Sequence, residues 1–122
     1  MRDEALLLDM PLAAGDVQEF VADLDQAQFD ASRLHQNAVV RCIEIIGEAA
    51  RGVSRDFQQA HPEIPWGAIV GMRHRLVHDY NQVDFDLVWI VARDRLPELI
   101  AVLEPLVPPP LLLFLKKADR VT

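Results

Sequence analysis

The sequence predicts an all-α protein, built as an up-and-down bundle of four main helices. Apolar residues recur three, four and seven positions apart in successive segments, the spacing that places them on one face of a helix. The links between these segments are short, which favours antiparallel neighbours. At 122 residues the chain has the size of a single domain with one core.

The first helix is predicted between Asp3 and Leu24. Two residues interrupt it, Pro11 and Gly15. Because proline lacks the amide that an interior turn uses, we expect either a kink near Met10 or a true start of the helix at Pro11. The apolar stripe consists of Leu6, Met10, Ala13, Val17, Phe20, Val21 and Leu24.

The second helix is predicted to follow Asp30, a suitable N-cap, and to end near Val53. Its apolar stripe consists of Leu34, Ala38, Cys42, Ile45, Ile46, Ala49 and Val53. Its opposite face carries the charged residues Arg41, Glu44, Glu48 and Arg51. The simpler interpretation of this face is a solvated ladder of ion pairs, each contributing a few tenths of a kcal/mol. The alternative is a role for Glu48 at the functional site.

A short helical turn is expected over residues 54–60. The prolines of residues 61–65 (HPEIP) then prevent a continuous helix. The third helix is expected to start at Pro65 or Trp66, since proline suits the first helical position, and to run to about Tyr80.

The fourth helix is predicted to start after an N-cap at Asp84 and to bend at Pro97. Its apolar stripe consists of Phe85, Val88, Trp89, Ala92, Leu96, Leu99, Leu103 and Leu106. We therefore expect one helical domain over residues 1–107 and a proline-rich tail over residues 108–122. The apolar run LLLFL in this tail is too short to cross a bilayer and is expected to pack on the domain or on a partner.

Composition and charge limit the classes of function. The net charge of −7 argues against broad, non-specific nucleic-acid binding, because lysine and arginine make most phosphate contacts. An RNA site would have to be local, and ten of the twelve basic residues are arginine, which suits phosphate. With no long apolar run and no basic leader, we expect a cytoplasmic protein without membrane contact. The single cysteine, Cys42, excludes an internal disulfide and is assigned to the core.

One segment, residues 73–80 (RHRLVHDY), breaks the helical pattern. Arg73 and Tyr80 fall inside the apolar arc of the third helix, where an ionised guanidinium is costly unless it is paired. Three explanations stay open for Arg73: a buried ion pair with a glutamate of the second helix, a contact between subunits, or a phosphate-binding arginine at the floor of a cleft. The arc itself consists of Trp66, Ile69, Val70, Leu76 and Val77.

Two histidines, His74 and His78, lie four residues apart on the flank of this arc, and Arg75 points away from it. Such a pair can bind zinc, but a site needs a third ligand and none is evident, so we expect no metal. A histidine near Arg73 and beside Tyr80 instead offers the groups for acid–base and phosphate chemistry. This set of residues is typical of a nuclease.

The motif Arg73-x4-His78-x-Tyr80 matches the R-x4-H-x-Y signature of the HEPN superfamily, and the chain resembles its HepT-type toxins. Three such fixed positions arise by chance in a chain of this length with a probability on the order of one in a few hundred. The chain departs from the family pattern at Pro11 and Gly15 and in its tail. Further similar segments are residues 46–50 (IGEAA), 61–66 (HPEIPW), 71–78 (GMRHRLVH), 88–89 (VW) and 96–97 (LP).

The resemblance implies a HEPN-like homodimer joined through the motif helices, with two copies of Arg73 and His78 lining one cleft. It also implies an endoribonuclease that uses no metal or other cofactor. His78 would act as general base or acid at the ribose 2'-hydroxyl or the leaving 5'-oxygen, and Arg73 would stabilise charge on the phosphate. His74 and Arg75 would orient the substrate. Because this chemistry needs the 2'-hydroxyl, RNA and not DNA would be cleaved, leaving a 2',3'-cyclic phosphate.

Similar toxins are encoded beside a small MntA-type nucleotidyltransferase antitoxin, which transfers AMP to the motif tyrosine, Tyr80 here. The resemblance thus implies the toxin of a type VII-like toxin–antitoxin system, silenced when AMP adds bulk and negative charge two residues from His78. Two alternatives stay open. Tyr80 could be a core ring with a hydrogen-bonded hydroxyl, and the chain could be a non-catalytic HEPN subunit that presents nucleotide or substrate to a partner nucleotidyltransferase.

Overall fold

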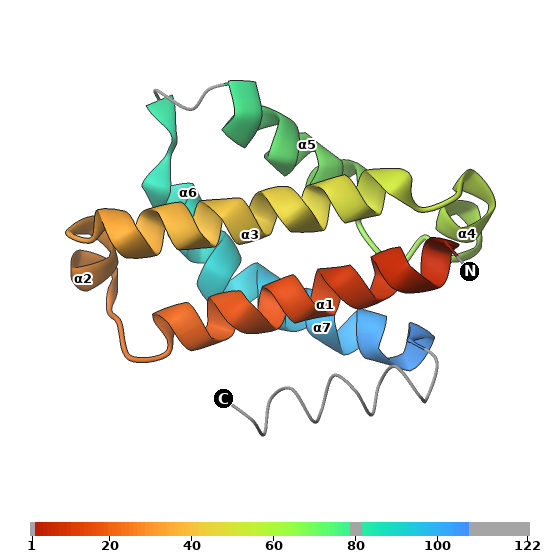
Figure 1. The fold of residues 1–122 in the computed structure, drawn as a ribbon, viewed down its shortest axis with the longest axis horizontal. Coiled ribbons are helices and arrows are strands. Elements are labelled where there is room, and N and C mark those ends of the chain that lie inside the picture. The colour runs from red at the N-terminus through yellow and green to blue at the C-terminus, as the bar shows by residue number, and fades with distance from the viewer. Residues whose placement is uncertain (1, 79–81, 108–122) are drawn as a thin grey trace.

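Helices α1 (Arg2–Val21) and α3 (Arg33–Gly52) lie side by side and form the frame of the bundle (Figure 1). The computed structural model of the chain describes residues 2–78 and 82–107, with the backbone alone for residues 77 and 78. Within these ranges there is no β-strand, so the predicted all-α class is confirmed. Tyr80 and the predicted tail over residues 108–122 lie outside the described residues.

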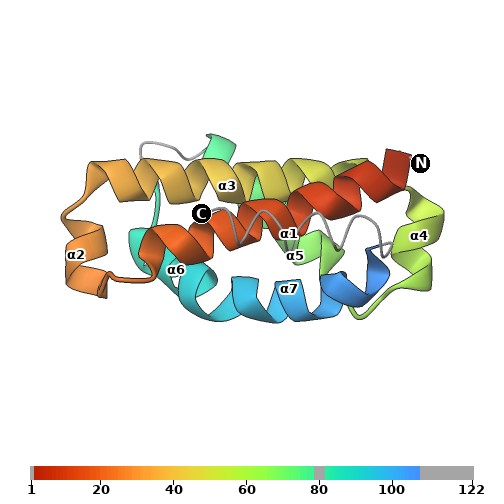
Figure 2. The same ribbon diagram turned by 60° about the horizontal axis from the view of Figure 1, so that its bottom comes forward.

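The long helices follow one another in alternating directions, as an up-and-down bundle requires. α5 (Trp66–His78) packs on one flank of α3, and α1 packs on the other (Figure 1). α7 (Leu96–Leu103) packs in turn against α1, as Figure 2 shows. Among the described helices, none is long and apolar enough to span a membrane.

Helix α1 is continuous through Pro11, so a start of the helix at that residue is wrong. An interior proline removes one backbone hydrogen bond and costs about 3 kcal/mol. Burial of the surrounding face offsets this cost, since Met10, Pro11 and Val17 are all buried. The helix ends at Val21, earlier than the predicted Leu24.

The first turn of α1 is joined to the start of α4 (Arg55–Ala60). The carboxylate of Asp3 accepts two hydrogen bonds from Ser54, one from the backbone amide at 2.9 Å and one from the hydroxyl at 2.7 Å. Both bonds favour the charged carboxylate and therefore lower the pKa of Asp3. Ser54 is also the N-cap of α4, which confirms the short helical turn predicted over residues 54–60.

A short helix that the sequence pattern did not predict precedes α3. This helix, α2, spans Gln26–Asp30 and begins at a capping box formed by Asp25 and Gln28. Asp30 therefore ends a helix, and its prediction as the N-cap of the next one is wrong. The N-cap of α3 is Ser32, whose hydroxyl oxygen accepts a hydrogen bond from the backbone amide of His35.

The fourth predicted helix is divided into several parts. α6 (Phe85–Ile90) begins at the predicted cap Asp84, whose side chain accepts a hydrogen bond from a backbone amide of the first turn. A π-helical turn, η2 (Val91–Arg95), leads into α7, and a 3-10 turn, η3 (Glu104–Leu106), follows α7. The sequence predicted a bend at Pro97. The structure instead has the wider π-helical turn η2 just before this residue, since proline has no backbone N–H for the hydrogen bond of a regular α-helical turn.

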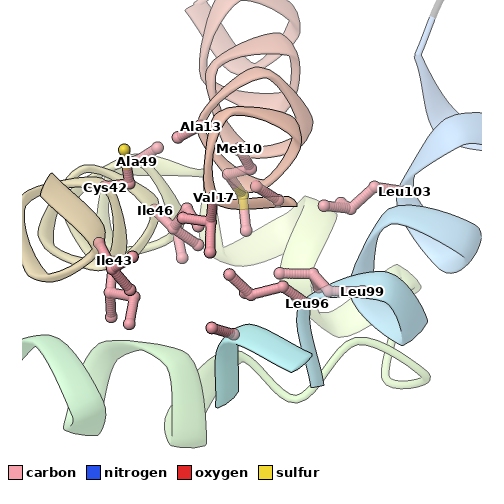
Figure 3. Close-up of a cluster of buried hydrophobic side chains, with 14 of the residues drawn as sticks. Met10, Ala13, Val17, Cys42, Ile43, Ile46, Ala49, Leu96, Leu99 and Leu103 are labelled. Atoms are coloured by element: carbon pink, nitrogen blue, oxygen red, sulfur yellow. The ribbon is translucent and has the colours of Figure 1, made fainter. Parts of the chain in front are cut away.

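Apolar side chains from α1, α3 and α7 meet in the centre of the bundle (Figure 3). A second group surrounds Phe29 of α2, whose ring centroid lies 5.2 Å from that of Trp89 and 6.4 Å from that of Phe85. Cys42 belongs to the core, as predicted, and burial raises the pKa of its thiol to about 11. The central group includes Met10, Ala13, Val17, Cys42, Ile43, Ile46, Ala49, Leu96, Leu99 and Leu103.

Candidate functional site

Arg73 lies at the contact between α5 and α3, directly opposite Gly47. A Cβ atom added to Gly47 would overlap the Cβ of Arg73 and would lie 3.1 Å from its Cγ and 3.2 Å from its Cδ. The aliphatic part of the arginine side chain therefore packs on the bare backbone of α3. Arg73 thus lies on the side of α5 that packs against α3.

The guanidinium of Arg73 has no partner among the described residues. Its Nε atom is buried and makes no hydrogen bond there, although the residue as a whole is only half-buried. Within residues 2–78 and 82–107 no ion pair joins Arg73 to a carboxylate. The first explanation, a buried pair with a glutamate of the second helix, is therefore wrong for the described part of the chain.

The charged face of α3 is solvent-exposed rather than part of this contact. Arg41 and Glu44 form an ion pair at 3.4 Å, as expected for a ladder of surface pairs. Glu48 is exposed, and within the described ranges no ion pair joins it to Arg73. Arg73 is half-buried and has no carboxylate partner in the described part of the chain, so it is able to accept an anionic ligand, and phosphate suits a guanidinium well.

The other predicted site residues of α5 are distributed around the same helix. His74 and Arg75 are both exposed, and Arg75 borders the groove described below. His78 lies in the last turn of α5, about 7.5 Å along the helix axis from Arg73. Its side chain, like the whole of Tyr80, lies outside the described residues. The structure therefore places Arg73 and His78 on one helix. That their side chains act together at one site stays a prediction.

A groove of about 540 Å³ separates α5 from α6, η2 and α7. Its lining is apolar except for two arginines, Arg75 and Arg95. The sequence did not predict this groove, because its two walls come from distant segments and both look like ordinary core faces. The apolar lining residues are Ile43, Ile46, Pro65, Ala68, Ile69, Gly71, Met72, Leu87, Val91, Leu96 and Leu99.

The sequence also gave no role to Gly47, although a signal was present. Glycine weakens a helix interior by about 1 kcal/mol relative to alanine, so a glycine within a strongly amphipathic helix points to a packing or functional reason.

The described residues contain no group of three or more histidine, cysteine, aspartate or glutamate side chains that could hold a metal ion.

Comparison with known proteins points to one family. The family model described as "Ribonuclease HepT-like" matches residues 10–106. A protein of Methanocaldococcus jannaschii named "Putative RNase MJ1380" is 38% identical over 96 residues, which cover 79% of this chain and 88% of that protein. A protein of Thermococcus cleftensis named "Probable ribonuclease HepT" is 37% identical over 90 residues, which cover 74% of this chain and 82% of that protein.

No solved structure matches the chain. The region matched by the family model begins within α1, ends with η3 and includes Gly47, Arg73 and His78. The family resemblance predicted from the motif is thus confirmed, and the chain belongs to the HepT-like ribonuclease family.

Proposed function

We propose that the protein is a metal-independent endoribonuclease in which Arg73 and His78 act at the scissile phosphate. The observation that carries this proposal is the state of Arg73, a half-buried residue of the motif helix whose buried Nε atom has no hydrogen-bond partner and whose guanidinium has no carboxylate partner among the described residues. In a family of ribonucleases, a phosphate group is the natural partner for such a cation.

In the proposed reaction, His78 takes the proton of the ribose 2'-hydroxyl, and the 2'-oxygen attacks the adjacent phosphorus. The bond from phosphorus to the 5'-oxygen then breaks, and the protonated His78 gives its proton to that oxygen, which leaves as a hydroxyl. Arg73 stabilises the additional negative charge on the phosphoryl oxygens. The products are a 2',3'-cyclic phosphate and a 5'-hydroxyl, while the exposed His74 and Arg75 orient the RNA.

The proposed active form is a homodimer joined through α5. Small residues on the exposed face of this helix support close contact with a second copy, since a Cβ atom added to Gly67 or Gly71 would meet no atom within 4 Å. The neighbouring apolar groove would be covered by the same contact. Two copies of the basic cluster in one cleft would also create a local positive field despite the net charge of −7.

RNA cleavage in the presence of EDTA tests this proposal. We expect the purified protein to cut single-stranded RNA equally well with and without EDTA, because no step uses a metal. An RNA with a single 2'-deoxy substitution at the cut site should stay intact, because the nucleophile is missing. Products are identified by gel mobility and by mass spectrometry of the cyclic phosphate.

Two outcomes would contradict the nuclease proposal: a requirement for added divalent metal, or cleavage of the 2'-deoxy substrate. Binding of RNA or nucleotide without any cleavage would instead identify the non-catalytic HEPN subunit that the sequence left as an alternative. The same RNA cleavage assays therefore distinguish the ribonuclease from the non-catalytic subunit.

We further propose that the chain is a toxin neutralised by AMP transfer to Tyr80 from a cognate MntA-type nucleotidyltransferase. AMP on Tyr80 would place negative charge two residues from His78, where an RNA phosphate binds in the proposed mechanism. After co-expression with such an enzyme, we expect the intact mass to rise by one or more AMP units and RNA cleavage to be lost. Tyr80→Phe should show neither change, and modification that persists in this variant would contradict the assignment.

A further inference from the structure

We propose that Gly47 of α3 is a positioning residue for Arg73, because the missing side chain at position 47 sets where the arginine lies. This inference rests on the proposed function, in which Arg73 contacts the phosphate. It concerns a residue of a different helix, outside the motif, that would never touch RNA itself.

The contact is made by the least adaptable part of the arginine. A methyl group at position 47 would overlap the Cβ atom of Arg73, which is bonded directly to the α5 backbone, and would also contact the Cγ and Cδ atoms. A flexible side-chain end could rotate away from such a methyl group, but a Cβ atom moves only with its backbone. An alanine at position 47 would therefore push α5 away from α3 or rotate it about its axis.

Gly47 differs in this respect from the other glycines of the chain. A Cβ atom at Gly15, Gly67 or Gly71 would meet nothing within 4 Å, and at Gly52 it would meet the end of the flexible Leu6 side chain at 3.0 Å. No glycine has a positive φ, so backbone conformation does not require glycine at position 47. The requirement comes from the approach of the two helices.

The consequence for Arg73 is a restrained side chain. Its stem is fixed between the two helices, and its Nε atom is buried without a hydrogen-bond partner among the described residues. An arginine in water loses rotamer freedom when it binds phosphate, whereas this one has lost much of it on folding. Gly47 thereby preorganises the guanidinium for the developing charge of the transition state.

Gly47→Ala tests the proposal, with Gly15→Ala as the matched control because its added methyl group meets open space. We expect Gly47→Ala to lower kcat for RNA cleavage by about 10- to 100-fold, the effect of a misplacement of roughly 1 Å, with a smaller change in KM. Helix content by circular dichroism should stay close to that of the unmodified protein. Gly15→Ala should keep full activity.

A spectroscopic measurement separates positioning from general loss of stability. The Nε–H group of Arg73, assigned in ¹⁵N NMR spectra by its absence in Arg73→Lys, should exchange with solvent more slowly than that of the exposed Arg75. In Gly47→Ala the Arg73 signal should shift and exchange faster, while in Gly15→Ala it should not change. Equal exchange of the two arginines in the unmodified protein would overturn the proposal even if Gly47→Ala failed to fold.

Activity and signal together distinguish this inference from the proposed function. Unchanged kcat in Gly47→Ala, or reduced kcat with an unchanged Arg73 signal, overturns the positioning role while the ribonuclease stands. If the unmodified protein cuts no RNA, the proposed function fails, and the catalytic part of this inference fails with it. The NMR comparison would then still report whether Gly47 holds the Arg73 side chain.

Discussion

Replacing His78 by alanine is expected to lower the rate of RNA cleavage by about 10²- to 10⁴-fold, the usual contribution of a positioned general acid or base. The substitution removes the imidazole that moves the proton, and it shortens a side chain in the last turn of α5. Alanine has the highest helix propensity, so circular dichroism and the thermal midpoint should change little. Single-turnover kinetics on a short labelled RNA give the rate of the chemical step directly.

The matched control for His78→Ala is His61→Ala, in the link between α4 and α5. The ring of His61 stacks on Phe57 and pairs with Glu63, away from the motif. This variant should keep full cleavage activity. Arg73→Ala should reduce the rate as His78→Ala does, and the double variant should lose little more, because the two groups act in one step. Normal cleavage by His78→Ala would exclude the proposed mechanism.

Replacing Phe29 by alanine is expected to lower the free energy of unfolding by about 3–5 kcal/mol, the usual loss for a buried aromatic ring. Phe29 is fully buried, and its ring packs against Trp89 and Phe85 of α6. Its removal would leave a cavity between α2 and α6 that the rigid neighbours fill only in part. The thermal midpoint should fall by about 10–20 °C for a domain of this size, as measured by differential scanning calorimetry.

Phe20→Ala is the control for this prediction. It removes the same kind of side chain, but Phe20 lies in α1 and is 36% exposed. Its loss of unfolding free energy should be well below that of Phe29→Ala, because most of the cost of such a substitution comes from the cavity. Equal effects of the two substitutions would show that α2 is not part of the cooperative core.

The periodic apolar stripes predicted the bundle because they record which face of each helix is buried. The cap at Asp84 and the break before Trp66 followed from local chemistry and are confirmed. Helix α2 was missed because five residues are too few to show a period. At Pro11 the local rule failed, since packing of α1 against its neighbours outweighed the missing hydrogen bond.

The candidate site was only partly predictable from the sequence. Arg73 was recognisable because a charge inside an apolar stripe contradicts the pattern. The sequence did not exclude an ion pair with a glutamate of the second helix, because the lack of such a pair among the described residues is visible only once the helices are placed. Gly47 and the groove depend on contacts between distant segments, and no spacing along the chain reveals them.

The apolar groove has a consequence for the energetics of α5. Because the groove separates this helix from α6, η2 and α7, α5 is held in the described structure chiefly by α3. Its local opening therefore requires the loss of one helix interface, whereas the opening of α1 requires the loss of several. The helix that carries the motif can thus respond to a ligand or a second subunit without unfolding the rest of the bundle.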